Sequence, residues 1–279
     1  MELDLDTGRL YVFLGGFLIF AIIETLFSKR ATNNTRSKRF AFHIGVATLN
    51  SVIVRMFLYV PFLLWVVYVE EEGWGISRWL GLVGWAEIII SIVVLDLFDY
   101  IWHRVNHQTR FLWRFHKAHH SDTHMDVSTA LRFHPGELII SSFVKALWIV
   151  VWGPTVIAWF LFEALVSLSA QFHHSNIDFP NGVERWLSAI IVTPRYHAAH
   201  HAVDRYYGDA NFSTILSLWD KIFLTYSKPG NDGSTTSESD SIGLPEQRHV
   251  AFSWVAWITE PFANRNLDIN DQQSPDNTH

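Results

Sequence analysis

The stretch His103–His120, HRVNHQTRFLWRFHKAHH, decides the fold of this chain, together with its later counterpart His197–His201, HAAHH. The two stretches hold eight of the fifteen histidines, in three clusters with helical spacing. Residues three and four apart share one face of a helix, so each cluster is expected to direct its imidazoles the same way. One metal ion rarely binds more than about six ligands, so eight converging imidazoles indicate a site for two ions.

The composition around these clusters is that of a membrane protein. Hydrophobic residues make up 49% of the 279-residue chain, charged residues only 17%, and the mean hydropathy is +0.13. The net charge of −6 gives no reason to expect nucleic-acid binding. The absence of cysteine excludes disulfides, thiolate nucleophiles and Cys-ligated metals.

Long apolar runs predict how the chain crosses the bilayer. Three runs suited to single spans cover residues 10–27, 40–69 and 85–101, and a fourth run, 138–172, contains Gly153-Pro154 and predicts a helical hairpin. We therefore expect an all-α integral membrane bundle of three spans plus a hairpin, capped by a His-lined helical region outside the membrane. The expected units are membrane spans at 1–84, a catalytic region at 85–227, and a polar linker with a C-terminal tail at 228–279.

Loop charges predict which face of the membrane carries the histidines. The loop 28–39 holds five Lys or Arg residues and no acid, which favours the cytoplasm, whereas Glu70–Glu72 lie at the other end of the second span. The third span then brings His103 and His107 to the cytoplasmic side, and the hairpin returns the chain to that side. The expected location is a multi-pass position in a bacterial inner membrane or the endoplasmic reticulum.

Metal chemistry narrows the function without fixing it. Neutral imidazole binds iron, zinc, copper or nickel, but zinc cannot change its oxidation state. Two redox metals at a membrane face favour O₂ activation for attack on a lipid C–H bond, which would require iron. Two alternatives stay open: a membrane protein that binds or transports metal without redox catalysis, and a silent relative that keeps its metal for structure.

A further pattern of motifs follows the histidines along residues 85–227. The motifs are Asp99-Tyr100-x-x-His103-Arg104-x-x-His107, Phe111-Leu112-Trp113-x-x-His116-x-x-His119-His120-Ser121, Leu131-Arg132-x-His134-Pro135, His174-Ser175-Asn176, Thr193-Pro194-x-x-His197-x-x-His200-His201, Asn211-Phe212 and Trp219-Asp220-x-x-Phe223-x-Thr225-Tyr226. In this order they resemble the fatty acid hydroxylase and sterol desaturase superfamily of membrane di-iron oxygenases.

The resemblance implies a ligand set and its partners. Two iron ions would be bound by His103, His107, His116, His119, His120, His174, His197, His200 and His201. His173 and His134 are further candidates, and His134 is equally compatible with a turn residue bonded to backbone. Asp99 is expected to accept a hydrogen bond from a ligating histidine. The reaction would use O₂ to hydroxylate or desaturate a sterol, fatty acyl or alkyl lipid, with electrons from a separate cytochrome b5-, ferredoxin- or reductase-type protein. The predicted positions of the third span and the hairpin, in turn, indicate that the lipid enters from the bilayer near Leu168 and Phe172.

Overall fold

The structure is a computed structural model that describes residues 5–30, 35–203, 208–227 and 242–263. The described part is helical and contains isolated bridges but no extended strand. The membrane-side helices are α1 (Leu5–Leu26), α2 (Arg36–Val54), the π-helical segment η1 (Arg55–Tyr59), α3 (Val60–Glu71), α4 (Ile76–Trp79), α5 (Gly84–Gln108), α7 (Pro135–Trp152) and α8 (Val156–His174). The remaining helices are α6 (Arg110–His120), η2 (Val127–Leu131), α9 (Asn181–Leu187), α10 (Pro194–His200), α12 (Leu218–Ile222), η4 (Pro245–Val250), α14 (Trp254–Thr259) and η5 (Glu260–Phe262).

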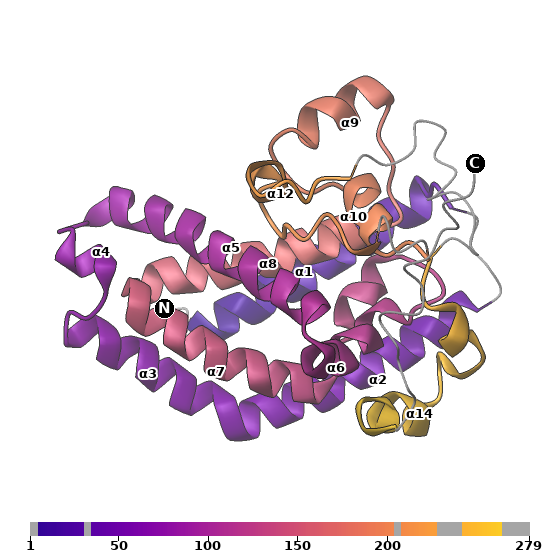
Figure 1. The fold of residues 1–279 in the computed structure, drawn as a ribbon, viewed down its shortest axis with the longest axis horizontal. Helices are drawn as coiled ribbons and strands as arrows, with labels where there is room; N and C mark the ends of the chain where they lie inside the picture. The colour runs from indigo at the N-terminus through magenta and orange to yellow at the C-terminus, as the bar shows by residue number, and fades with distance from the viewer. Residues whose placement is uncertain (1–4, 31–34, 204–207, 228–241, 264–279) are drawn as a thin grey trace, which may run out of the picture.

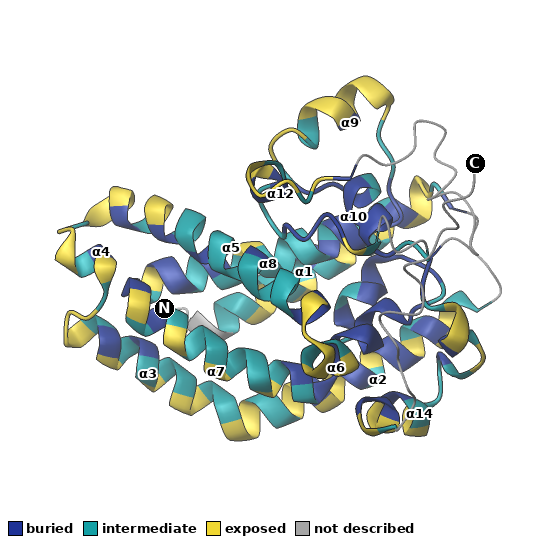
Figure 2. Cartoon of the chain, viewed as in Figure 1, coloured by how far each residue is buried: buried dark blue, intermediate teal, exposed yellow. Residues whose placement is uncertain are grey.

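The long helices lie roughly side by side along the longest axis of the molecule (Figure 1). Within the described residues, four segments are long and apolar enough to cross a membrane, namely Thr7–Leu26, Arg36–Trp79, Pro135–Trp152 and Val156–His174. Their outward faces are largely exposed, as the yellow and teal ribbon of the bundle shows (Figure 2). This exposure of apolar surface is expected where lipid is the solvent, and it identifies a membrane protein.

The third expected span differs from this set. Helix α5 is long enough to cross a bilayer, but it carries Glu87, Asp96, Asp99 and Arg104. Two of these charges are fully buried and face protein: Glu87 accepts a hydrogen bond from the hydroxyl of Thr155, and Asp96 accepts three from the segment that precedes and begins α12. Helix α5 is therefore covered by protein on its polar side.

The hairpin predicted at Gly153-Pro154 is confirmed as α7 and α8. Gly153 adopts the left-handed region at φ 73°, and a Cβ at this position would lie 1.9 Å from the carbonyl oxygen of Trp74. Only glycine fits such a close approach at positive φ. The next helix begins after Thr155, whose hydroxyl accepts a hydrogen bond from the backbone N–H of Ala158 and caps α8.

The membrane helices are fixed to the His-bearing end by buried polar contacts. Glu24 near the end of α1 accepts hydrogen bonds at 2.9 Å from the backbone N–H groups of Val127 and Asn176. Arg39 in α2 binds Asp122 through two nitrogens at 2.8 and 2.9 Å, just beyond α6. Because these residues are buried, α1 and α2 set the position of the loop that follows α6.

The C-terminal region is more closely packed than its composition suggests. Residues 228–241 and 264–279 lie outside the described residues, so most of the expected linker and the end of the tail are not characterised. Residues 242–247, expected to belong to the linker, include the buried Ile242 and Gln247. Glu260 accepts a hydrogen bond from Lys117 of α6 at 2.7 Å, so the described part of the tail packs against the helix that carries the central histidines.

Candidate metal centre

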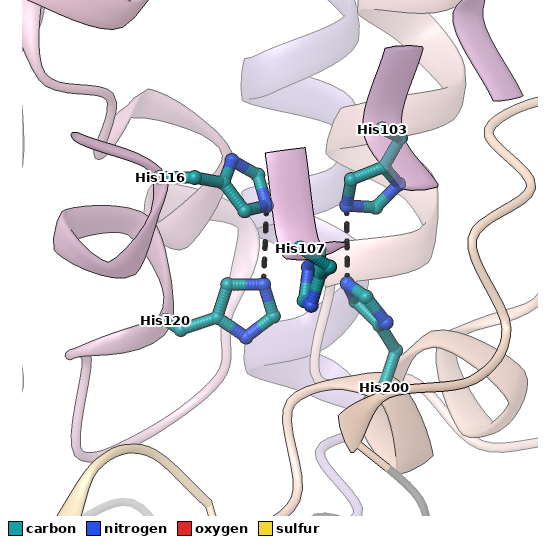
Figure 3. Close-up of side chains that lie close together, drawn as sticks. All are labelled: His103, His107, His116, His120 and His200. Atoms are coloured by element: carbon teal, nitrogen blue, oxygen red, sulfur yellow. Dashed lines mark hydrogen bonds between the residues drawn. The ribbon is translucent and has the colours of Figure 1, made fainter. Parts of the chain in front are cut away.

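Five of the predicted histidines meet at the end of α5. Their ligand-competent ring nitrogens lie within 4.8 Å of one another, and Figure 3 shows the rings converging from three helices. His103 and His107 come from α5, His116 and His120 from α6, and His200 from α10. The spacing of four residues within α5 and within α6 places each pair on one helix face, as the sequence predicts.

Four more histidines form a second group under the same distance limit. They are His119 of α6, His174 at the end of α8, His197 of α10 and His201 just beyond α10. The two groups together contain the nine histidines that the sequence singled out as ligands. Their role as ligands stays a prediction, but the structure brings them together as a two-ion site requires.

The two His-x-x-His-His motifs divide in opposite ways. In α6, His116 and His120 join the first group while His119 joins the second. In α10, His200 joins the first group while His197 and His201 join the second. Residues four apart differ by about 40° around a helix and residues three apart by about 60° the other way. Helices α6 and α10 therefore lie between the two groups and contribute to both.

The nitrogen separations fit shared metal ligands. The Nε2 atoms of His103 and His200 are 3.1 Å apart, and those of His116 and His120 are 3.2 Å apart. In the second group, the Nε2 atom of His174 lies 3.0 Å from that of His119 and 3.1 Å from that of His197. Two nitrogens that bind one ion at ~2.1 Å and at right angles would be about 3 Å apart.

Hydrogen bonds fix the tautomer of several rings. The Nδ1 atoms of His103, His200 and His174 lie 2.8, 2.7 and 2.7 Å from backbone carbonyl oxygens of Phe212, Ala210 and Ala170. A carbonyl oxygen only accepts, so each Nδ1 carries the proton and each Nε2 keeps its lone pair for a metal. The buried Nε2 of His107 has no hydrogen-bond partner among the described residues, which also suits a metal ligand.

Two carboxylates lie beside the first group: Asp209 Oδ1 is 3.4 Å from the Nδ1 atom of His107, and Glu137 makes the shorter contact. The Nδ1 atom of His116 donates to Glu137 Oε1 at 2.8 Å, and both side chains are buried. Asp99, which the sequence assigned to this task, instead forms a hydrogen bond with Thr214 and lies near Lys145. Glu137 is in the first turn of α7 and has no distinguishing sequence signal, because only the packing of α7 against α6 brings it to His116.

Burial keeps several of these imidazoles neutral. Desolvation lowers the pKa of His103 to about 3, and it holds the pKa values of His120 and His200 well below their usual range. Nearby imidazoles act in the same direction, because each disfavours a second positive charge close by. Neutral rings are the form that binds metal ions.

The two further candidates lie outside both groups. His134 is the N-cap of α7: its Nδ1 accepts a hydrogen bond from the backbone N–H of Gly136 at 3.0 Å. This favours the turn role that the sequence left open. The ring of His173 packs against that of His197 at 4.0 Å between centroids, and it therefore borders the second group without being one of its four members.

A cavity of about 450 Å³ lies among the membrane helices. Its lining comes from α1, from α2 through α3, and from α7 and α8, including Leu58 and Tyr59 of the π-helical segment. At one end Asn50 donates to the carbonyl oxygen of Phe133 at 2.7 Å, and the Phe133 ring is stacked on His119 at 4.5 Å. The cavity-lining Asn50 is therefore linked through Phe133 to His119 of the second histidine group.

The lining of the cavity also contains a partly buried charge network. Glu163 of α8 accepts hydrogen bonds from Lys145 at 2.8 Å and from Arg9 at 3.4 Å. Glu163 precedes His174 by eleven residues, or about 16 Å along α8. Leu168 and Phe172, expected along the lipid path, do not line this cavity; Leu168 lies close to Gly16, and Phe172 packs 5.8 Å from Phe20.

Sequence comparison agrees with this geometry. Residues 88–225 match the family described as fatty acid hydroxylase, and that range contains all nine histidines of the two groups. This chain belongs to the fatty acid hydroxylase family. It is 26% identical over 179 residues to ornithine lipid hydroxylase OlsE of Rhizobium tropici, covering 64% of this chain and 51% of that protein.

Other relatives match over similar or shorter lengths. Human alkylglycerol monooxygenase is 30% identical over 181 residues, covering 60% of this chain and 38% of that protein, and human cholesterol 25-hydroxylase is 23% identical over 144 residues, half of each chain. This chain thus spans about half of these relatives or less. No solved structure shows significant similarity to it.

Proposed function

We propose that this chain is a membrane-bound di-iron oxygenase that uses O₂ to oxidise a lipid, by hydroxylation in preference to desaturation. The observation that carries the proposal is the pair of buried histidine groups within the segment that matches the family. Hydroxylation is favoured because the relatives named above are called hydroxylases or monooxygenases. We retain residues 85–227 as the catalytic region.

The imidazole nitrogens of the two groups suit two ions of a metal such as iron or zinc, for which imidazole is a favourable ligand. The first group would hold one ion through five imidazoles and the second group would hold another through four. When bound, a pair of iron ions would supply the redox chemistry that O₂ activation needs and that zinc lacks.

The chain's own residues prepare this site in three ways. Backbone carbonyls and Glu137 orient the imidazoles and fix their protons on Nδ1, so the Nε2 atoms point inward. Burial lowers the pKa values of His103, His120 and His200, which keeps these rings neutral, and it excludes bulk water. Phe133 is bonded through its carbonyl oxygen to the cavity-lining Asn50, and its ring is stacked on His119, so Phe133 would lie near a substrate chain that approaches from the membrane helices.

The cavity supports a lipid with a long hydrocarbon chain as the substrate. Its volume lies within the range of ordinary ligand sites, about 300–1,000 Å³. All of its lining residues belong to the four segments that can cross a membrane, so an alkyl chain would enter it without passing through water. That route avoids a cost of roughly 0.8 kcal/mol per exposed CH₂ group. On α8, Ala164 and Ser167 are the cavity-lining residues nearest the histidines.

Electrons would come from a separate protein of the cytochrome b5, ferredoxin or reductase type. We place the site on the cytoplasmic face, because the basic loop after α1 and the histidines lie at the same end of the molecule. Lys29 of that loop donates its backbone N–H to Asn176 at 3.0 Å, two residues after His174. A metal transporter would instead need ligands along a path through the bilayer, whereas both groups lie at one end of the bundle.

The direct test is metal analysis followed by a turnover assay. We expect two iron ions per chain after anaerobic purification from iron-replete cells, and O₂-dependent lipid oxidation when a reductant is supplied. Zinc in one preparation would not decide the matter, because zinc binds such sites more tightly than Fe(II). One iron per chain after reconstitution would refute the two-ion site, and a full iron load without lipid oxidation would favour the metal-handling alternative.

A further inference from the structure

An apolar surface projects from the side of the molecule on α9 and α12. We call it the α9–α12 face, and its members are large hydrophobic side chains: Val183, Trp186, Ile190, Leu218, Ile222, Phe223 and Leu224. Trp186 is 66% exposed and Leu224 is 90% exposed. Figure 2 shows α9 mostly in the yellow of exposed residues. Scattered exposed hydrophobic residues are ordinary, but a group of seven on adjacent short helices is not.

The two helices form one unit. The backbones of Ile191 and Leu216 pair in an isolated bridge, and the hydroxyl of Ser217 donates to the carbonyl oxygen of Ser188 at 2.8 Å. Lys221 of α12 donates to the carbonyl oxygen of Ala189 at 2.7 Å. The face is therefore held together by hydrogen bonds and does not consist of unrelated loops.

This unit is attached to the middle of α5. Asp96 accepts hydrogen bonds from the backbone N–H groups of Ile215 and Leu216, at 3.1 and 3.0 Å, and from Trp219 Nε1 at 2.8 Å. Non-helical backbone at membrane depth is tolerated only when its polar groups are satisfied inside the protein. Asp96 provides this for the segment that leads into α12.

The attachment point lies at the depth of the hydrocarbon core. Trp79 and Trp85 are 84% and 76% exposed at the end of the bundle away from the histidines, where they resemble an interfacial aromatic belt. Asp96 follows Trp85 by eleven residues, which is at most about 16 Å along α5. The hydrocarbon core is about 30 Å thick, so α12 meets α5 well inside it. Figure 1 shows α9 and α12 beside the long helices and not beyond their ends.

The charges of this unit suit a position within one leaflet, with apolar side chains toward the acyl chains and basic side chains toward the headgroups. The acids of both helices are buried: Glu184 bonds to Thr193, and Asp220 accepts a hydrogen bond from Tyr196 at 2.9 Å. The other charged residues of α9 and α12 are basic, the exposed Arg185 and the partly exposed Lys221. Basic side chains beside an apolar face suit the headgroup region of a lipid leaflet.

The turn after α12 holds one apolar side chain outward. Leu224 has φ 57°, in the left-handed region that a bulky residue rarely adopts. The conformation is fixed by Asp220, whose carbonyl oxygen accepts hydrogen bonds from the backbone N–H groups of Thr225 and Tyr226 at 2.8 and 3.1 Å. The fold thus maintains a strained turn whose result is the almost complete exposure of a leucine.

We propose that the α9–α12 face is inserted into the lipid leaflet on the His-bearing side, with its apolar side chains among the acyl chains. The chain shortly before α12 supplies the carbonyl oxygens of Ala210 and Phe212, which accept hydrogen bonds from His200 and His103. The face is therefore close in sequence to the residues that orient two members of the first histidine group. This inference concerns the membrane position of the protein and does not depend on the proposed reaction.

Depth measurement with single cysteines tests the proposal, because the chain contains no cysteine of its own. Ile222→Cys and Trp186→Cys would each carry an environment-sensitive fluorophore in nanodiscs that hold one protein copy. We expect quenching by phospholipids with spin-labelled acyl chains, and little quenching by aqueous iodide. Ile157→Cys on the outer surface of α8 is the lipid-facing reference, and Glu72→Cys after α3 is the aqueous reference.

The two outcomes are distinct. Labels at Ile222 and Trp186 that behave like the label at Ile157 support insertion. If iodide quenches these labels as strongly as the label at Glu72, the insertion proposal is wrong. The α9–α12 face would then be a contact surface for a second copy or another protein. Two labelled positions on different helices keep the test valid if one variant fails to fold.

Discussion

Removal of the carboxylate of Glu137 should weaken iron binding without unfolding the protein. Glu137 Oε1 accepts the Nδ1 proton of His116 at 2.8 Å, and both groups are buried. Partners of this kind typically contribute 10- to 100-fold to metal affinity, or about 1.4–2.7 kcal/mol. We expect the loss of iron affinity in Glu137→Ala to lie near the upper end of this range, because His116 then loses both its hydrogen-bond acceptor and the nearby negative charge.

The amide variant separates these two effects. Glu137→Gln keeps an oxygen that can accept from His116 and removes only the charge, so its loss should be nearer to tenfold. Folding should tolerate this change, because the second oxygen of Glu137 is buried without a hydrogen-bond partner among the described residues. Its burial already has a cost that the neutral amide reduces.

Iron affinity is measured by competition with a chelator of known strength, and folding by the melting temperature of the metal-free protein. Glu87→Gln is the matched control, since Glu87 is also buried and bonds to Thr155 but lies in the first turn of α5, away from the histidines. Equal iron affinity in Glu137→Ala and the unmodified protein would refute the role given to this contact. Equal losses in Glu137→Gln and Glu87→Gln would show a general effect of removing a buried carboxylate.

Three further predictions follow from the site, the loops and the cavity. His200→Ala should abolish turnover and lower iron content while the protein stays in the membrane, whereas His249→Ala on the exposed surface should change neither; normal turnover by the first variant would exclude that ligand. Cysteines at Lys38 and Glu71 should react with impermeant reagents from opposite sides, Lys38 from the cytoplasm; labelling of both from one side would overturn the topology. Ala164→Phe should narrow the cavity and shift oxidation toward lipids with shorter chains, while the iron content stays unchanged. If the variant changed only the iron content and not the preferred chain length, the cavity would not be the substrate-binding site.

Much of the architecture could be predicted from local patterns. Apolar length predicted the membrane helices, and Gly153-Pro154 predicted the turn between α7 and α8. These features depend on residues close in sequence, which helix geometry and backbone sterics constrain directly. The sequence also shows the acidic residues of α5, but their partners could not be predicted from it. Asp96, for example, bonds to a residue 120 positions later.

Clusters at helical spacing and the family motifs were enough to predict all nine members of the two histidine groups. How the nine histidines are divided between the groups depends on the packing of separate helices. Each His-x-x-His-His motif divides between the groups because α6 and α10 lie between them, and that placement depends on contacts such as His103 with His200, 97 residues apart. The same reason explains why Glu137 replaces Asp99 beside a histidine. Spacing along one helix fixes the direction of a side chain relative to that helix, whereas the group it joins depends on how separate helices pack.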